Sequence, residues 1–159
     1  MAKALTAEDR FGILEAIQRY VQAVDSGAFE LFDDAFLPDA DLDYRSAGGP
    51  RGSRDEVRDW LARCRAGVVH WQHHLSPPVF DATGPAVRTR TDVYVPNLVR
   101  GEGGAVEILH TGGRYHDELV STPRGWRIAR RRFENTWAHG AGVGDLIPDP
   151  GGAGGAAPR

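Results

Sequence analysis

The spacing of apolar residues changes from mainly helical to alternating near Trp71, and that change restricts the folds the chain can adopt. Before it, apolar residues recur every three or four positions, as on a helix with one buried face. These positions are Phe11, Leu14, Ile17, Val21 and Val24. After it, β-branched residues alternate with charged ones, as on a strand with one buried face. These positions are Val87, Thr89, Thr91, Val93 and Val95. Helices followed by consecutive antiparallel strands predict an α+β domain.

Capping residues mark where the first helix begins and ends. Thr6 precedes Glu8 and Asp9, acids that the positive end of the helix dipole favours, and Gly27 is a typical stop. Three phenylalanines at helical spacing predict a short second helix that Pro38 closes. They are Phe29, Phe32 and Phe36. We expect this helix to pack flat against the first.

A strand and a third helix are expected next. Residues 40–46 alternate between apolar and polar side chains, with Tyr44 on the apolar face, which predicts a strand. A turn rich in Gly and Pro follows. Ser53 and Glu56 have the spacing of a capping box, so we expect a third helix that runs through Cys64.

Two long strands complete the predicted sheet. They cover residues 107–120 and 126–137, and a tight turn joins them. The composition then changes to Gly, Pro and Ala with little to bury. We therefore assign residues 1–138 to one domain and residues 139–159 to a flexible tail.

Charge and composition exclude several classes of protein. The chain has 159 residues, a formal net charge of −3 and a pI near 6.0, so a nucleic-acid partner is not expected. The basic cluster Arg130, Arg131 and Arg132 lies in a predicted strand, where alternation would turn one Arg inward. Cys64 is the single cysteine, which excludes an intramolecular disulfide. No long apolar run supports secretion or membrane insertion, so a cytoplasmic location is expected.

Six histidines are the first candidates for acid/base chemistry, because imidazole titrates near neutral pH. His70, His73 and His74 lie in one short segment. On a strand, His73 and His74 point to opposite faces, so at most one of them faces a given pocket. No CxxC or HExxH spacing brings metal ligands together, so we expect no metal site.

The residue pattern alone does not identify an acid/base partner for any of these histidines. Asp25 ends an apolar helix, where local hydrogen bonds are its commoner role. Tyr20 and Tyr44 lie on apolar faces, where a tyrosine is usually part of the core. Tyr20 and Asp25 are also about 140° apart around an ideal helix. Both would face one pocket only if the helix ends or bends near Gly27.

Two segments resemble a known family. The run RYVQAVDSGAFELFDDAFLPDADLDYRS resembles the opening of the SnoaL-like, nuclear transport factor 2-like superfamily, and GRYHDELVSTPRGWRIARRR resembles its closing hairpin. The resemblance covers residues 6–137. It implies a cone-shaped α+β barrel in which three N-terminal helices pack on a curved antiparallel sheet and enclose a pocket.

Within that superfamily the chain is most similar to scytalone dehydratase and bile-acid 7α-dehydratase. Both have an Asp ending the first helix, a Tyr in the first strand and a His after the third helix, where this chain has Asp25, Tyr44 and His73. Tyr20 matches a further Tyr of the bile-acid enzyme. The resemblance implies a cofactor-independent dehydratase, a lyase that acts on a hydroxylated polyketide-like or steroid-like ketone. His73 would be the general base, Asp25 its partner, and Tyr44 with Tyr20 the groups that bind the substrate carbonyl.

Two positions depart from these enzymes. Asn97 stands where scytalone dehydratase has a second pocket histidine, and Asn135 where the bile-acid enzyme has an Arg on its last strand. Both changes concern the substrate rather than the acid/base pair. The residues expected to line the pocket are Asn97, Tyr115, Trp71, Phe133, Asn135 and Trp137.

Other functions are compatible with the same resemblance, because one fold hosts many activities. The alternatives are a cyclase, an isomerase or an epoxide hydrolase that uses the same pocket, or a non-catalytic ligand-binding or assembly module. In the last case Arg88, Arg90 and Arg130 would form an interface on the convex face. We expect a small apolar cyclic substrate, no membrane partner, and a homo-oligomer, either a trimer or a dimer.

Overall fold

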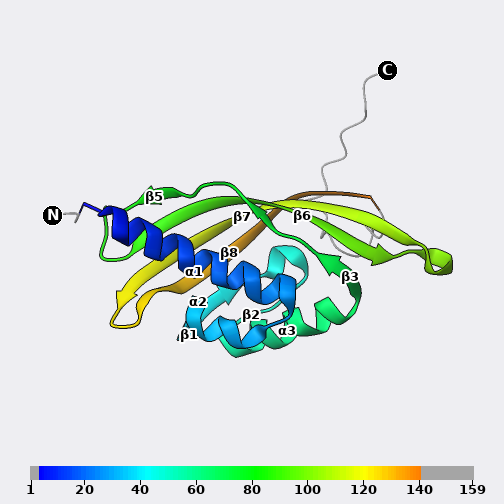
Figure 1. Ribbon diagram of the computed structural model, residues 1–159, viewed down its shortest axis with the longest axis horizontal. Coiled ribbons are helices and arrows are strands. Elements are labelled where there is room, and N and C mark those ends of the chain that lie inside the picture. Colours follow the sequence, from blue (N-terminus) through cyan, green and yellow to red (C-terminus); the bar gives the residue numbers. More distant parts are fainter. Residues whose placement is uncertain (1–3, 141–159) are drawn as a thin grey trace, which may run out of the picture.

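The computed structural model describes residues 4–140 (Figure 1). The α-helices are α1 Ala7–Ser26, α2 Phe32–Ala35 and α3 Arg54–Ala66. The strands are β1 Phe36–Asp43, β2 Arg51–Gly52, β3 Val68–Trp71, β4 His74–Leu75, β5 Val79–Asp81, β6 Val87–Arg100, β7 Val106–Thr122 and β8 Gly125–Gly140. Short 3₁₀ turns lie at Phe29–Leu31, Arg45–Ala47 and Glu102–Gly104.

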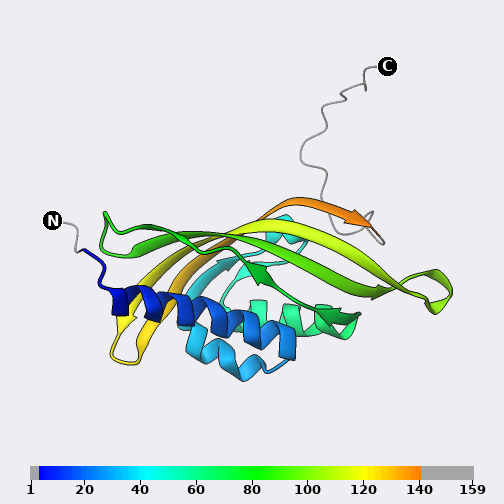
Figure 2. The same ribbon diagram turned by 45° about the horizontal axis from the view of Figure 1, so that its top comes forward.

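The eight strands form one open sheet. Its order is β2-β1-β8-β7-β6-β3, and β4 and β5 also pair with β6. The helices lie on one face of the sheet, which arches over them (Figure 2). The α+β class and the cone are confirmed, but the predicted barrel does not close, because β2 and β3 are free edges. The sheet is also not wholly antiparallel, since β1 pairs with β8 in parallel.

The predicted helix caps are confirmed. The Thr6 hydroxyl accepts a hydrogen bond from the backbone of Asp9, whose carboxylate accepts one from the backbone of Thr6. Ser53 and Glu56 form the same reciprocal pair at the start of α3. Gly27 ends α1 with a φ of 81°, a left-handed conformation that glycine adopts without strain.

The second helix is shorter than predicted. A 3₁₀ turn and the single turn of α2 end at Ala35, and Phe36 is already extended. Pro38 lies inside β1 rather than beyond a helix. The β1–β8 register is irregular between Phe36 and Asp41, so Pro38 sits where its missing N–H breaks no regular ladder.

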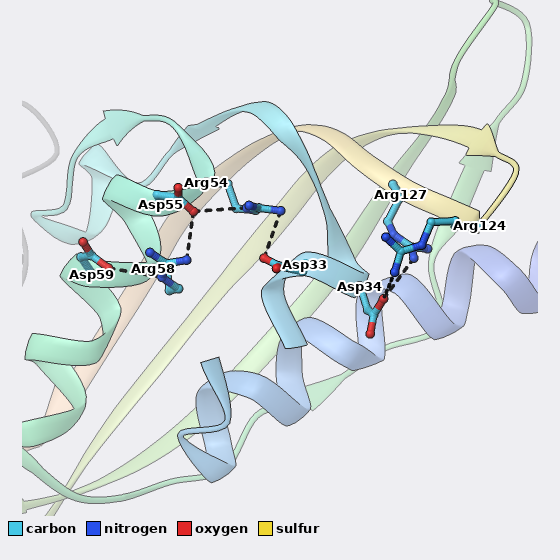
Figure 3. A network of polar contacts seen from close by, with 8 residues as sticks. All are labelled: Asp33, Asp34, Arg54, Asp55, Arg58, Asp59, Arg124 and Arg127. Carbon is cyan, nitrogen blue, oxygen red and sulfur yellow. Dashed lines mark hydrogen bonds and ion pairs between the residues drawn. The ribbon is translucent and has the colours of Figure 1, made fainter. Parts of the chain in front are cut away.

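Ion pairs fasten α2 to its neighbours (Figure 3). Asp33 pairs with Arg54 of α3 at 3.0 Å. Asp34 pairs with Arg127 of β8 at 3.2 Å and with Arg124, in the β7–β8 turn, at 3.7 Å. The short helix is thus held against both α3 and the sheet, and with it the start of β1.

The last strand extends two residues beyond the predicted domain boundary. His139 and Gly140 pair with His110 and Leu109 of β7. The rest of the predicted tail, residues 141–159, lies outside the described residues. Within residues 4–140, no helix is both long and apolar enough to cross a membrane.

Candidate functional site

His73 and Asp25 meet where the segment between β3 and β4 passes the C-terminal end of α1. The ring nitrogen Nδ1 of His73 lies 2.5 Å from Oδ1 of Asp25. The backbone N–H of His73 donates to Oδ2 at 2.9 Å. Both carboxylate oxygens are therefore bound by one residue, which holds the carboxylate in a single orientation.

The electrostatics of this pair determine which nitrogen carries a hydrogen. Burial alone would raise the pKa of Asp25, but the hydrogen bonds from His73 outweigh burial and hold that pKa below its usual value. Asp25 is therefore a charged acceptor at neutral pH. Because a carboxylate only accepts, Nδ1 of His73 donates to it, and Nε2 makes no hydrogen bond within residues 4–140.

Two aromatic rings pack against the His73 imidazole. Tyr20 meets it edge-on with ring centroids 6.4 Å apart, and Trp71 does so at 6.3 Å. Helix α1 remains regular to Ser26, so no bend brings Tyr20 and Asp25 together. Both reach His73 because the segment that carries it passes across the end of the helix.

The predicted tyrosines gather around a buried cation. The Arg131 guanidinium lies 4.3 Å from the ring centre of Tyr20 and 4.1 Å from that of Tyr115. It also forms a two-point ion pair with Asp117. The Tyr44 hydroxyl lies beside Tyr20 and Arg131 but makes no well-formed hydrogen bond within the described residues. Burial raises the pKa of both Tyr20 and Tyr44, so both are neutral.

A cavity of about 360 Å³ lies between α3 and the inner face of the sheet, and neither His73 nor Asp25 is among the residues that line it. Its lining residues are Ala47, Trp60, Leu61, Cys64, Gly67, Val68, Trp71, Asn97, Val99, Leu109, Thr111, Phe133 and Asn135. None of these side chains is charged. Trp71 joins the two features, because it lines the cavity and contacts His73.

Four of the six residues expected in the pocket line this cavity: Trp71, Asn97, Phe133 and Asn135. Tyr115 does not line it. Its ring lies 5.3 Å from that of Phe133, and the Tyr44 ring lies 5.9 Å from the same residue. Both tyrosines are buried, so they form a layer behind the Phe133 wall.

Trp137 lies on the opposite face of the sheet, which corrects its assignment to the pocket. Gly112 pairs with Trp137 and Gly113 with Asn135, so Thr136 is an extra residue in β8. This β-bulge reverses the alternation of side chains beyond it. Trp137 is accordingly 47% exposed and stacks on Tyr94 of the outer face.

The two asparagines of the cavity differ in how they are held. The Asn97 amide nitrogen donates to the carbonyl oxygens of Val95 and Leu109 and to the Thr111 hydroxyl, at 2.9, 3.0 and 3.2 Å. The Asn135 side chain makes no such contact within the described residues, and its Oδ1 is buried without a partner. Only the Asn97 amide is fixed in orientation.

Sequence reasoning missed the partner of the inward arginine. The alternation correctly predicts one inward Arg among residues 130–132, and Arg131 is fully buried. Asp117 lies two residues after Tyr115, so alternation predicts that both side chains face the same side of the sheet. Alternation does not predict that Asp117 pairs with Arg131. Within residues 4–140, no three His, Cys, Asp or Glu side chains gather to hold a metal ion.

Comparisons with known proteins identify relatives of this chain. The model of the SnoaL-like domain matches residues 5–132. The uncharacterized protein Rv2910c of Mycobacterium tuberculosis (strain H37Rv) is 30% identical over 131 residues, which are 82% of this chain and 88% of the relative. A protein of Mycobacterium bovis, Mb2934c, matches equally well.

Solved structures share the fold. The Kfla4162 protein from Kribbella flavida has a TM-score of 0.73 at 18% identity, covering 82% of this chain and 93% of its own. A candidate scytalone dehydratase from Novosphingobium aromaticivorans has a TM-score of 0.69 at 21% identity, with coverages of 89% and 93%. A hexachlorocyclohexane dehydrochlorinase, LinA type 2, has a TM-score of 0.68 at 15% identity, with coverages of 92% and 99%.

Proposed function

Because this chain belongs to the SnoaL-like domain family, we propose that it is a cofactor-independent lyase that removes water from a hydroxylated polyketide-like or steroid-like ketone. The observation that carries the proposal is the 2.5 Å contact between His73 Nδ1 and Asp25 Oδ1. The contact orients the His73 base, and the Trp71 ring that packs on His73 also lines a cavity of about 360 Å³, a volume typical of small-molecule sites.

In the proposed reaction, Nε2 of His73 removes a proton from the carbon next to the substrate carbonyl. Asp25 stabilises the imidazolium that forms, and the electron pair moves onto the carbonyl oxygen to give an enolate. The enolate then expels the β-hydroxyl group, which takes the proton from His73. The products are one water molecule and a conjugated enone, and His73 returns to its neutral form.

We assign stabilisation of the enolate oxygen to Tyr44, assisted by Tyr20. Support comes from the Tyr44 hydroxyl, a buried donor without a well-formed hydrogen bond in the described chain. The assignment requires the substrate to reach past Phe133, against which the Tyr44 ring is stacked.

The cavity chemistry supports a neutral cyclic substrate. Its described lining is apolar and aromatic apart from two amides, a hydroxyl and a thiol, and an ionic substrate would lose its hydration there without a counter-charge. The dehydrochlorinase of the same fold is named for the removal of HCl, which is also an elimination. That likeness supports elimination as the reaction class.

The test uses 3-hydroxy-1-tetralone, because loss of water converts this bicyclic ketone to 1-naphthol, which is followed by fluorescence. We expect turnover by the unmodified chain. The His73→Ala variant should lose at least about 100-fold in kcat/KM, the usual contribution of a general base.

His110→Ala is the matched control, because His110 lies on the outer face in contact with Tyr94. It should keep its activity. Equal rates for His73→Ala and the unmodified chain would refute the role of His73. A product with the same mass as the tetralone would indicate an isomerase or cyclase instead. An epoxide analogue is tested separately, and its conversion to a product that has gained water would indicate an epoxide hydrolase.

A further inference from the structure

The Asn97 amide is held in one orientation by the sheet. Its two N–H groups are shared among three acceptors: the carbonyl oxygens of Val95 and Leu109 and the hydroxyl of Thr111. The reverse orientation would place the amide oxygen against two carbonyl oxygens, which repel it. Both N–H groups of the amide therefore have acceptors in the protein, and this orientation also fixes the position of the amide oxygen.

The oxygen of this amide serves the cavity. Asn97 is 92% buried yet lines the cavity, and its Oδ1 makes no hydrogen bond within residues 4–140. A fixed acceptor in a largely apolar wall discriminates strongly between ligands, because a ligand without a donor leaves the acceptor unpaired. A ligand that presents an acceptor of its own is repelled.

We infer that Asn97 determines substrate specificity by accepting a hydrogen bond from a ring hydroxyl of the substrate. The inference rests on the proposed function, since it takes the cavity as the substrate site. It narrows the substrate class to cyclic compounds with a free phenol or secondary alcohol at the Asn97 end. Ethers and esters at that position are excluded, as are ketones.

The position of Asn97 separates this hydroxyl from the reacting end of the substrate. Asn97 is paired with Trp71 across β6 and β3, and Trp71 in turn contacts His73. The acceptor is thus on the sheet wall, and the base is beyond the Trp71 ring. A substrate that spans both would be oriented by Asn97 and deprotonated by His73.

The test measures binding rather than turnover, so that it does not depend on the reaction. Calorimetry gives the Kd of 2-naphthol, which has the donor, and of 2-methoxynaphthalene, which lacks it. We expect the unmodified chain to bind the naphthol roughly tenfold more tightly. Protection of Cys64 from a maleimide locates the ligand, because Cys64 is the only cysteine and lines the cavity.

Asn97→Leu should reduce this preference to nearly onefold, with the methyl ether bound at least as well as before. Asn135→Leu is the matched control, since it makes the same exchange in the same cavity at an amide that is not fixed; it should keep the preference. If Asn97→Leu does not fold, the two ligands on the unmodified chain still decide.

The outcomes separate this inference from the proposed function. The role of Asn97, but not the proposed function, would be overturned by either of two results. One is equal affinity of the unmodified chain for 2-naphthol and 2-methoxynaphthalene, and the other is a preference for 2-naphthol that persists in Asn97→Leu. If neither 2-naphthol nor 2-methoxynaphthalene binds, and neither protects Cys64 from the maleimide, the inference is overturned together with the assigned substrate site. Tight naphthol binding without turnover of 3,6-dihydroxy-1-tetralone, which adds the phenol that Asn97 would bind, would support Asn97 and contradict the lyase.

Discussion

Arg131 and Asp117 form a two-point ion pair that is completely shielded from solvent. Nε of Arg131 lies 2.7 Å from Oδ1 of Asp117, and Nη2 lies 2.7 Å from Oδ2. Both side chains have zero exposure. Burial opposes the charge on Arg131, but Asp117 outweighs that effect and keeps the pKa of the guanidinium raised. The rings of Tyr20 and Tyr115 pack on the same guanidinium, so the pair supports the layer behind the cavity.

Removing one partner of this pair should be costly. Asp117→Ala leaves the Arg131 charge buried without a counter-ion, and we expect a loss of about 3–5 kcal/mol in the free energy of unfolding, measured by urea denaturation. Asp41→Ala breaks an ion pair with Arg51 whose side chains are 37% and 54% exposed, and should cost much less. A double variant, Asp117→Leu with Arg131→Met, should recover much of the loss. Similar small losses in both single variants would contradict this account.

The pH dependence of stability should carry the signature of Asp25. Its pKa is lower in the folded chain than its ordinary value of 3.8, so the unfolded chain binds the proton more readily. The stabilisation from Asp25 is therefore complete above about pH 4 and is lost as the pH falls through the lower folded pKa. Urea unfolding of the unmodified chain and of Asp25→Asn should show a difference in free energy that narrows as the pH falls below about 4. A difference that is constant with pH would count against the hydrogen-bonded carboxylate.

Ligand binding should distinguish the two faces of β8. Phe133 lines the cavity and Trp137 stacks on Tyr94 outside it. We expect Phe133→Leu to weaken 2-naphthol binding several-fold, because it removes an aromatic wall, whereas Trp137→Ala should leave the Kd unchanged. The measurement is calorimetric titration of both variants. If Trp137→Ala weakened binding and Phe133→Leu did not, Trp137 would line the cavity, which would contradict the β-bulge at Thr136.

Much of the fold was predictable because it depends on neighbours in the sequence. The caps of α1 and α3 involve residues three positions apart, and both are found as predicted. The alternation near residue 131 correctly predicts that one Arg turns inward. Alternation also succeeds for Phe133 and Asn135, but it fails at Trp137, since one extra residue in a strand reverses the parity of all that follow.

The amino-acid sequence predicts the α+β class, the caps of two helices and, through resemblance, the Asp and the His of the candidate pair. The tertiary structure alone brings Asp25 and His73, 48 positions apart, into a hydrogen bond and makes Asp117 the partner of Arg131. It also decided that the Asn97 amide oxygen is left for the cavity. The physical reason is range: caps and periodicity arise from residues within one turn or one strand. Pairings between distant segments follow from strand register, bulges and the path of a loop past a helix end, which no local pattern encodes.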